Sequence, residues 1–202
     1  MKIVHIETII SVGTYPRTDH WKRTKNELYA AIKDVDWPRG SGKFTIYPES
    51  GKKRGKGNGV TPIKLGLISY LTGTGWKAEE PLRIAARKNP GKIDAVLYSK
   101  YGAIALEWET GNISSSHRAL NKICLGLIKK LLVGGILVVP SREFYQYLTD
   151  RVGNWDEIEP YIDVWKGIRC KNGVLEIVVV EHDATSKKVP RIRKGTAGRA
   201  LA

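Results

Sequence analysis

The sequence has little cysteine and no apolar run long enough to cross a membrane. Only two of its 202 residues are cysteines, Cys124 and Cys170, and they lie far apart without CxxC spacing. Neither a disulfide framework nor a zinc site is therefore predicted. The longest apolar runs are GGILVVP and VLEIVVVE. They have the length of a strand, whereas a membrane-spanning helix needs about 20 residues.

The chain also lacks the marks of a secretory signal. Its apolar start is interrupted by His5 and Glu7, and no small-residue cleavage site follows. These absences favour the cytoplasm and predict no membrane partner. No internal repeat is present, and 202 residues are enough to bury one core. We therefore expect a single domain over residues 1–202.

Acidic residues are few relative to basic ones. The chain has 20 Asp and Glu against 34 Lys and Arg, which gives a formal net charge of +14. Such an excess predicts a polyanionic partner, most simply a nucleic acid. An anionic membrane surface would satisfy the same charge, so the net charge alone does not choose between the two.

Hydrophobic periodicity predicts an α/β protein. Helical spacing of apolar residues predicts helices over 19–35, 62–72, 114–132, 142–149 and 155–161. Apolar runs rich in β-branched residues predict strands over 43–48, 92–98, 103–109, 135–140 and 174–181. The run 135–140 is typical of a strand that is buried on both faces and has parallel neighbours. With the strand 103–109 and the helix between them, it is predicted to form a right-handed βαβ unit.

Two basic segments are expected to lie loosely at the surface. One is the glycine-rich segment 48–59, and the other is the tail 186–202. The simplest interpretation of the first is a solvated, flexible loop. The same loop could become ordered on a phosphate backbone through Lys53 and Lys56.

The candidate chemistry lies in two neighbouring β-like runs, KIDAVLY and AIALEWE. If the intervening SKYG makes a hairpin, Tyr98 faces Ala103, and Asp94 faces Glu107 with Cβ atoms about 4.5–5.5 Å apart. The two-residue period of a strand puts Glu109 on the same face as Glu107. Three carboxylates crowded in this way are costly unless a cation lies among them, and Mg²⁺ prefers such oxygens.

This cluster suits the hydrolysis of a phosphodiester. A metal between carboxylates and phosphate polarises the phosphoryl oxygen and stabilises the leaving alkoxide, and a spare carboxylate can take a proton from water. A membrane-binding protein has no evident use for such a cluster. Alternatively, Glu107 and Glu109 only solubilise an exposed edge; Asp94 and the basic chain weaken that interpretation.

The residues that follow the carboxylates are short and polar or basic. A helix that starts with the serines 114–116 as its N-cap would direct free N–H groups and the positive end of its dipole toward an anion. Asn112, Ser114 and Arg118 are able to meet base edges or phosphate, although capping alone would explain some of them. Asp150 and Arg151 could read one G·C pair side by side, because Arg matches the guanine edge and Asp accepts from cytosine. They could also form an ordinary surface pair.

Longer motifs resemble those of a known family. The stretches EWETGNISSSHRALNK and YLTDRVGNWDEIEPY, with NGVTPIK and GKIDAV upstream in the same order, resemble the BamHI-like type II restriction endonucleases. The resemblance covers roughly residues 57–165. It implies a restriction-endonuclease-like core, in which helices flank both faces of a central mixed β-sheet. It also implies a homodimer that uses Mg²⁺ to cut both strands of the palindrome GGATCC, leaving 5′ overhangs.

The resemblance also implies roles for single residues. Asp94 and Glu107 match the principal metal ligands, and Glu109 matches the general base, where most nucleases of this fold carry lysine. Glu79 in KAEEPLRI matches a further acidic residue of the metal site, although Glu80 is adjacent. Lys64 matches a lysine close to the active site.

The resemblance assigns DNA recognition in the major groove to five positions: Asn112, Ser114, Arg118, Asp150 and Arg151. The chain departs from the family pattern in its short SKYG turn and in its tail, which has Ala197 where an acidic residue is expected. Minor-groove contacts from the tail are therefore not predicted. The homodimer is expected to form through helix 114–132 and segment 154–161. The alternative is a sequence-specific DNA-binding protein without catalysis, against which the three carboxylates argue.

Overall fold

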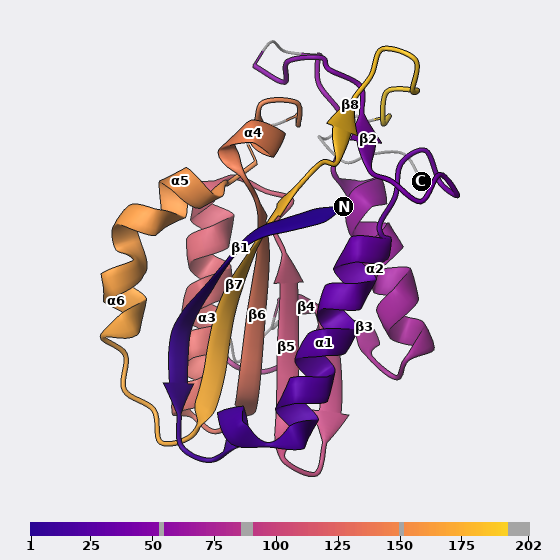
Figure 1. The fold of residues 1–202 in the computed structure, drawn as a ribbon. Helices are drawn as coiled ribbons and strands as arrows, with labels where there is room; N and C mark the ends of the chain where they lie inside the picture. Colours follow the sequence, from indigo (N-terminus) through magenta and orange to yellow (C-terminus); the bar gives the residue numbers. More distant parts are fainter. Residues whose placement is uncertain (53–54, 86–90, 150–151, 194–202) are drawn as a thin grey trace.

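The structure, a computed structural model, describes residues 1–52, 55–85, 91–149 and 152–193. A mixed six-stranded sheet in the order β1-β7-β6-β5-β4-β3 forms its centre (Figure 1). The strands are β1 (Lys2–Val12), β3 (Lys77–Pro81), β4 (Lys92–Ser99), β5 (Gly102–Trp108), β6 (Leu132–Pro140) and β7 (Gly173–Glu181). The three central strands β5, β6 and β7 are parallel, and the outer pairs are antiparallel. A separate parallel pair consists of β2 (Thr45–Ile46) and β8 (Ala184–Thr185).

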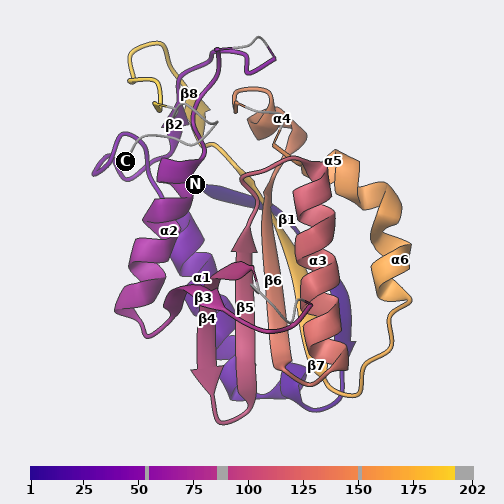
Figure 2. The same ribbon diagram turned by 180° about the vertical axis from the view of Figure 1, so that it is seen from behind.

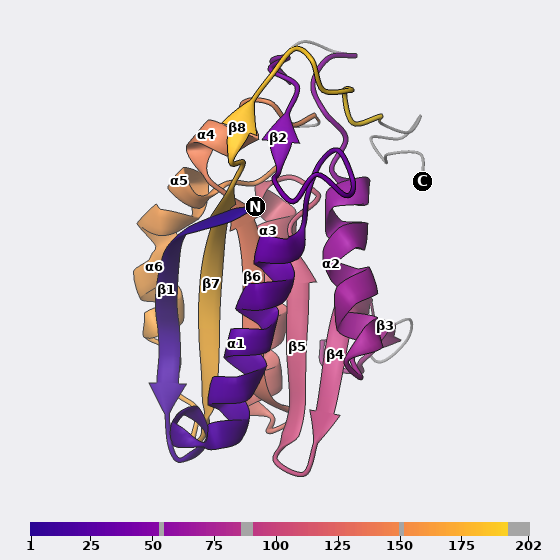
Figure 3. The ribbon, with the colours of Figure 1, turned by 45° about the vertical axis from the view of Figure 1, so that its right-hand side comes forward.

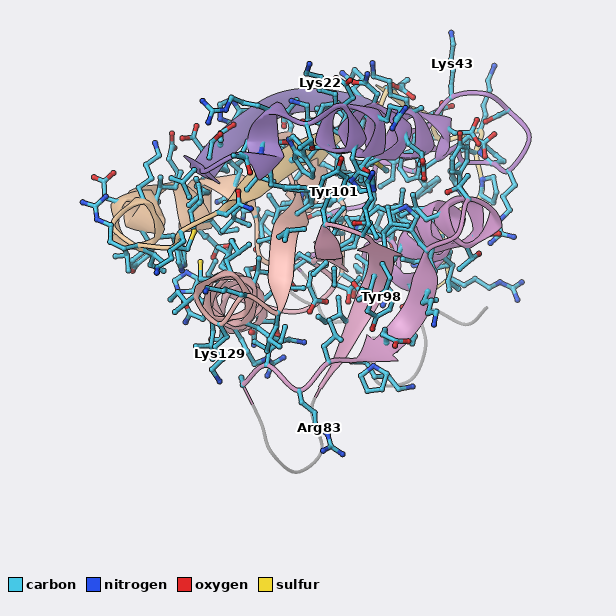
Figure 4. All side chains as sticks on the ribbon, turned by 90° about the horizontal axis from the view of Figure 1, so that it is seen from below. Lys22, Lys43, Arg83, Tyr98, Tyr101 and Lys129 are labelled. Carbon is cyan, nitrogen blue, oxygen red and sulfur yellow. The ribbon has the colours of Figure 1, made fainter. Side chains whose placement is uncertain are left out.

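Helices cover both faces of the large sheet. Helices α1 (Asp19–Asp34) and α2 (Thr61–Gly73) lie on one face (Figure 3), and α3 (Ile113–Ile128) and α6 (Ile162–Lys166) lie on the other (Figure 2). Seen from below, Lys22 of α1 and Lys129 at the end of α3 lie on opposite sides of the sheet (Figure 4). The shorter helices are η1 (Tyr15–Arg17), α4 (Arg142–Tyr145), α5 (Trp155–Ile158) and η2 (Glu159–Tyr161). The predicted α/β class, with a mixed sheet flanked on both faces, is confirmed.

Strand β6 shows why the sequence folds into these layers. Its side chains alternate between two cores: Ile136 and Val138 pack with α1 and α2, whereas Leu137 and Val139 pack with α3. A strand that is buried on both faces needs a continuous apolar run, which GGILVVP supplies. A Cβ on Gly135 would overlap the side chain of Ile123 in α3, so the helix lies very close to the strand. The predicted βαβ unit of β5, α3 and β6 is confirmed.

The predicted hairpin register is also correct. Tyr98 pairs with Ala103, and Ala95 pairs with Leu106. Asp94 and Glu107 are the next residues in this register, and the Asp94 N–H donates to Glu107 Oε2 at 3.4 Å.

Several predicted boundaries are wrong. The helix predicted to reach residue 132 ends at Ile128, because Lys130 adopts a φ of 59° and the Leu131 N–H turns back to the carbonyl of Gly126 at 2.9 Å. The helix predicted over 142–149 is limited to Arg142–Tyr145, since the following residues pair with another segment. Strands β1 and β3 were not predicted from the sequence. Within the described ranges, no helix is long and apolar enough to cross a membrane.

The described parts of the two basic segments make specific contacts, contrary to the expectation that they lie loosely. Glu49 accepts a hydrogen bond from Arg191 at 2.7 Å, which joins the loop to the tail. Ile192 is fully buried, and Trp37 donates to the carbonyl of Pro190 at 2.8 Å. Residues 53–54 and 194–202 lie outside the described residues.

Candidate active site

The predicted carboxylates meet in an open cleft of about 420 Å³ between the sheet and α3. Asp94 comes from the start of β4, while Glu107 and Glu109 come from the end of β5. Arg118 and Lys122 of α3 line the opposite wall. Because β4 and β5 are antiparallel, the start of one strand lies beside the end of the other, and this brings the three acids together.

Asp94 is held by two hydrogen bonds. Its Oδ1 accepts from the Lys64 ammonium at 2.8 Å, and its Oδ2 accepts from the Trp108 backbone N–H at 2.8 Å. Lys64 belongs to α2, so it reaches the cluster from the other side of the hairpin. Burial disfavours the Lys64 ammonium, but Asp94, Glu79 and Glu107 outweigh that effect and raise the pKa of Lys64 above its ordinary value.

Glu107 is paired with a lysine that the sequence did not indicate. Its Oε1 lies 3.1 Å from the ammonium of Lys122, and both side chains are largely buried. Burial raises the pKa of Glu107, and Asp94 raises it further, whereas Lys122 opposes the shift. Lys122 follows Arg118 by four residues, so the two lie on the same face of α3. That spacing was the available signal for Lys122.

Glu79 and Glu80 point to different partners. The Glu79 carboxylate lies 3.6 Å from the Lys64 ammonium, although half of its side chain is exposed. Glu80 instead accepts a hydrogen bond from the Tyr98 hydroxyl at 2.9 Å. Glu79 has a φ of 52°, in the left-handed region. Of the two adjacent glutamates, only Glu79 reaches the Lys64–Asp94 pair in the described structure.

Glu109 is buried beside the N-terminus of α3. Its carboxylate accepts hydrogen bonds from the Ser116 hydroxyl and from the Gly111 backbone N–H. The side chain is only 5% exposed, and this burial raises the pKa of Glu109 to about 7, although both hydrogen bonds act in the opposite direction. Ser116 is a contact that the sequence analysis did not single out.

The donor set of the cleft fits a hard divalent cation. Asp94 and Glu107 of the cleft offer carboxylate oxygens, and Glu79 offers another near Lys64, although it is not among the residues that line the cleft. Each of the three already lies beside the ammonium of Lys64 or Lys122. In the described part of the chain, no three His, Cys, Asp or Glu side chains form a ready metal cluster. The carboxylate oxygens are of the type that suits a divalent cation, while their cationic partners in the structure are lysines.

The predicted recognition residues of α3 lie at its first turns. Asn112, not a serine, is the N-cap: its side chain accepts from the Ser115 N–H at 3.3 Å. Ser114 is exposed. Arg118 is also exposed, lines the cleft and donates to the Ser115 hydroxyl at 3.4 Å. The predicted serine cap is wrong because the asparagine two residues earlier takes the extended conformation that a cap requires.

Of the remaining predicted DNA contacts, Lys56 lies within the described residues. Asp150, Arg151 and Lys53 lie outside the described residues. Lys56 lies 3.5 Å from the carboxylate of Glu49, with about half of its side chain exposed.

Comparisons with known proteins agree with this architecture. The sequence model of the family described as "Restriction endonuclease BamHI" matches residues 1–199. The chain is 48% identical over 201 residues to "Type II restriction enzyme OkrAI" of Oceanobacter kriegii, covering 100% of both chains. It is 35% identical over 180 residues to "Type II restriction enzyme BamHI" of Bacillus amyloliquefaciens, covering 86% of this chain and 80% of that protein.

One solved structure has a similar fold. It is described as "Crystal structure of restriction endonuclease BGLII complexed with DNA 16-mer", and the TM-score is 0.58 with 11% identity over 95% of this chain and 88% of that chain. At this identity the likeness shows the fold alone, which is the restriction-endonuclease fold. The sequence matches extend into the first fifty residues, which the motifs did not cover.

Proposed function

This chain belongs to the BamHI family of restriction endonucleases, and on that premise we propose that it cuts both strands of DNA at a palindromic site with Mg²⁺. The site that the resemblance implies is GGATCC, cut to leave 5′ overhangs. The observation that carries the proposal is the convergence of Asp94, Glu107 and Glu109 in one cleft beside Lys64 and Lys122. A basic chain and an acidic cleft suit a phosphodiester substrate that is held by cations.

Asp94 and Glu107, with Glu79, would hold Mg²⁺ in the cleft. When bound, Mg²⁺ polarises the phosphoryl oxygen and stabilises the charge on the leaving group. The Trp108 N–H and Lys64 orient Asp94 through both of its oxygens. This arrangement reduces the reorganisation that metal and substrate binding require.

Glu109 would take the proton of the attacking water. Its carboxylate is fixed by Ser116 and Gly111, and each oxygen retains a second lone pair for a water molecule. A general base in this position typically contributes a factor of about 100 to 10,000 to the rate. Burial beside the cleft also excludes most of the competing solvent.

Base reading is assigned to the N-terminal part of α3 and to the segment after α4. Asn112, Ser114 and Arg118 lie where the free N–H groups and the positive dipole end of α3 favour DNA. Asp150 and Arg151 would read one G·C pair. Lys53 and Lys56, in the basic loop 48–59, would contact phosphates and no bases.

A homodimer would match the symmetry of a palindrome, because each subunit would offer one copy of every reading residue to one half-site. The side of the molecule formed by α3 and segment 154–161 carries apolar side chains that are about half exposed: Ile128 at 48% and Tyr161 at 51%. Sedimentation or light scattering at micromolar protein tests the dimer. A mass of 22.5 kDa with and without DNA would contradict it.

Incubation of plasmid DNA with the protein tests the activity. Discrete fragments should form with Mg²⁺ and not with EDTA, and sequencing of the fragment ends should give GGATCC and the stagger together. A shift in DNA mobility without cutting would instead select the non-catalytic DNA-binding protein.

A further inference from the structure

Three segments that are distant in sequence meet around one buried asparagine. They are the described residues of the loop, 47–52 and 55–59, with residues 146–149 and 190–192. The asparagine is Asn58, whose exposed fraction is 0%. They lie near β2, β8 and α4, at the end of the sheet where α2 and α3 begin (Figures 1 and 3). This is also the end that carries the cleft, because β5 ends there and β4 starts there.

The backbone of Asn58 pairs with the segment that follows α4. Its N–H donates to the carbonyl of Tyr147 at 2.8 Å, and its carbonyl accepts from the Thr149 N–H at 2.9 Å. These bonds form a parallel bridge opposite Leu148. They also explain why the helix predicted over 142–149 stops early, since the backbone of 147–149 is used in this bridge.

The side chain of Asn58 joins the other segments to the same place. Its Nδ2 donates to the carbonyls of Tyr47 and Tyr147 at 2.9 and 3.0 Å, and its Oδ1 accepts from the Ile192 N–H at 3.1 Å. Both donor hydrogens and the acceptor are therefore used in a site without solvent. A buried amide of this kind is costly to leave unpaired, so the three segments are held together strongly.

Two glycines pack against the same backbone. Gly51 donates to the carbonyl of Gln146 at 2.9 Å, and a Cβ on Gly51 would overlap the Leu148 carbonyl. Gly57 has a φ of 85°, and a Cβ there would lie 2.7 Å from the Cα of Gly51. The loop therefore approaches residue 148 as closely as backbone atoms allow.

The described part of the tail closes this cluster. The side chain of Ile192 is fully buried, and its carbonyl accepts from the Gly59 N–H at 3.0 Å. Arg191 donates to Glu49 at 2.7 Å, and Glu49 also accepts from the Gly57 N–H at 3.0 Å.

The segment that Asn58 holds leads to the catalytic side of the cleft. A few residues beyond Thr149, the Gly153 N–H donates to the carbonyl of Gly111 at 2.8 Å. A Cβ on Gly153 would overlap the hydroxyl of Ser116, which is the group that donates to Glu109. Gly153 is thus packed without spare room against Ser116, whose hydroxyl holds Glu109.

We propose that Asn58 is a positioning residue for DNA discrimination, which fixes segment 147–149 relative to the N-terminus of α3. The proposal rests on the proposed function, because it assumes that DNA lies across this end of the sheet. Asn58 touches no DNA in this scheme. It acts by fixing the position of segment 147–149. Without the hydrogen bonds of Asn58, the position of this segment relative to the cleft would vary.

The test compares Asn58→Ala with a matched control. Asn172→Ala also removes an amide that satisfies backbone groups, since Asn172 Oδ1 accepts from the N–H groups of Thr14 and Tyr15 at 2.9 Å each. Asn172 lies at the other end of the sheet, beside the start of β7. Binding is measured in Ca²⁺, below the unfolding temperature of each variant, on a GGATCC duplex and on a scrambled duplex of equal length.

Asn58→Ala should reduce the preference for the GGATCC duplex by about tenfold to a hundredfold, the value of a good base contact. Asn172→Ala should keep the preference for the GGATCC duplex, even if the unfolding temperatures of the two variants fall by similar amounts. Hydrogen exchange of peptides that contain 147–149 and 190–192 should rise in Asn58→Ala only. A preference that falls equally in the two variants, or in neither, would overturn the proposal.

Gly51→Ala gives a second, independent perturbation, because it displaces the Leu148 backbone and leaves the Asn58 side chain intact. It should lower the preference in the same way, and it decides the matter if Asn58→Ala does not fold. Unchanged preference in Gly51→Ala would count against the proposal. The proposed function fails separately, namely if the wild type neither prefers nor cuts any duplex.

Discussion

The ammonium of Lys122 on α3 lies 3.1 Å from the carboxylate of Glu107 on β5. The same ammonium donates to the carbonyl of Lys92 at 3.0 Å, at the start of β4. Lys122 thus joins the helix to both strands of the hairpin that carries the acids. On the other side of the cluster, the ammonium of Lys64 on α2 pairs with Asp94 of β4 at 2.8 Å. Two lysines from helices on opposite faces of the sheet therefore pair with Asp94 and Glu107, whereas Glu109 is held by neutral donors.

Neutralising either principal carboxylate should abolish cleavage and spare binding. Asp94→Asn and Glu107→Gln each remove an expected metal ligand and also remove negative charge that faces phosphate. Cleavage with Mg²⁺ should collapse, while DNA affinity in EDTA should hold or improve. Glu80→Gln is the control, because Glu80 contacts Tyr98 and should cut normally. Wild-type cleavage rates in either cleft variant would refute the assignment.

Glu109→Gln should bind DNA with little turnover. The substitution keeps the size of the side chain and removes the proton acceptor, so a loss of about 100- to 10,000-fold in cleavage rate is expected. Single-turnover cleavage, measured with saturating protein, separates this loss from a loss of affinity. If Glu109→Gln cuts at the normal rate, another group is the base.

The same variant should change how stability depends on pH without metal. The folded-state pKa of Glu109 is raised from 4.5 to about 7, so the unfolded chain loses this proton first as pH rises. Glu109 therefore destabilises the fold progressively between these two values and reaches its full cost above the higher one. Glu109→Gln removes this cost. Its gain in unfolding temperature over the wild type, in EDTA, should be small near pH 4.5 and larger at pH 8. A gain independent of pH would contradict the prediction.

Lys122→Met should make the fold more responsive to divalent cations. The change keeps most of the apolar stem and leaves Glu107 without its ammonium partner. In EDTA the free energy of unfolding should fall by about 2 kcal/mol, the value of a hydrogen bond to a charged group. Ca²⁺ should then raise the unfolding temperature more in this variant than in the wild type. Lys129→Met is the control, because Lys129 donates to the Ile84 carbonyl rather than to a cleft carboxylate. If Ca²⁺ raises the unfolding temperature equally in the wild type and both variants, the Lys122 ammonium does not occupy the position of a bound cation.

Residues that read bases and residues that contact phosphates should affect DNA affinity differently. The first should change the preference for the cognate sequence, and the second should change the dependence of affinity on salt concentration. Arg151→Ala should lower affinity for GGATCC by about 1–3 kcal/mol with little change on scrambled DNA. Lys53→Ala and Lys56→Ala should weaken both duplexes alike, and each should reduce the salt dependence by about one unit. Binding in Ca²⁺ at several salt concentrations measures both effects. If Arg151→Ala weakens the two duplexes equally, Arg151 contacts the backbone and does not read a base.

The sequence could predict the hairpin because its register follows from local rules. A short turn between two β-like runs fixes which residues are opposite, and Tyr98 pairs with Ala103 as expected. The strand period then fixes the side of Glu107 and Glu109. The helices were predictable in the same way, since an apolar stripe marks the face of α3 that contacts the sheet. Boundaries were less predictable: the left-handed Lys130 that ends α3 occurs at a residue with no special preference for that conformation.

Contacts between distant segments could not be read from the order of residues. The choice between Glu79 and Glu80 depends on where Lys64 of α2 and Tyr98 of β4 come to lie, and neither residue is near them in sequence. The spacing of Lys122 from Arg118 gives its face of the helix, but its pairing with Glu107 appears only when α3 packs against the sheet.

By itself, the sequence determined the alternation of elements and the grouping of three acids at one hairpin, because backbone periodicity and turn length act over a few residues. Only the tertiary structure decided which cations face those acids, that β1 joins the sheet beside β7, and that Asn58 gathers a loop, a turn and the tail. These depend on packing between residues that are 134 positions apart for Asn58 and Ile192, and 179 positions apart for Lys2 and Glu181. The reason is physical: a buried polar group must find its partner wherever the whole chain places one, and no local pattern encodes that position.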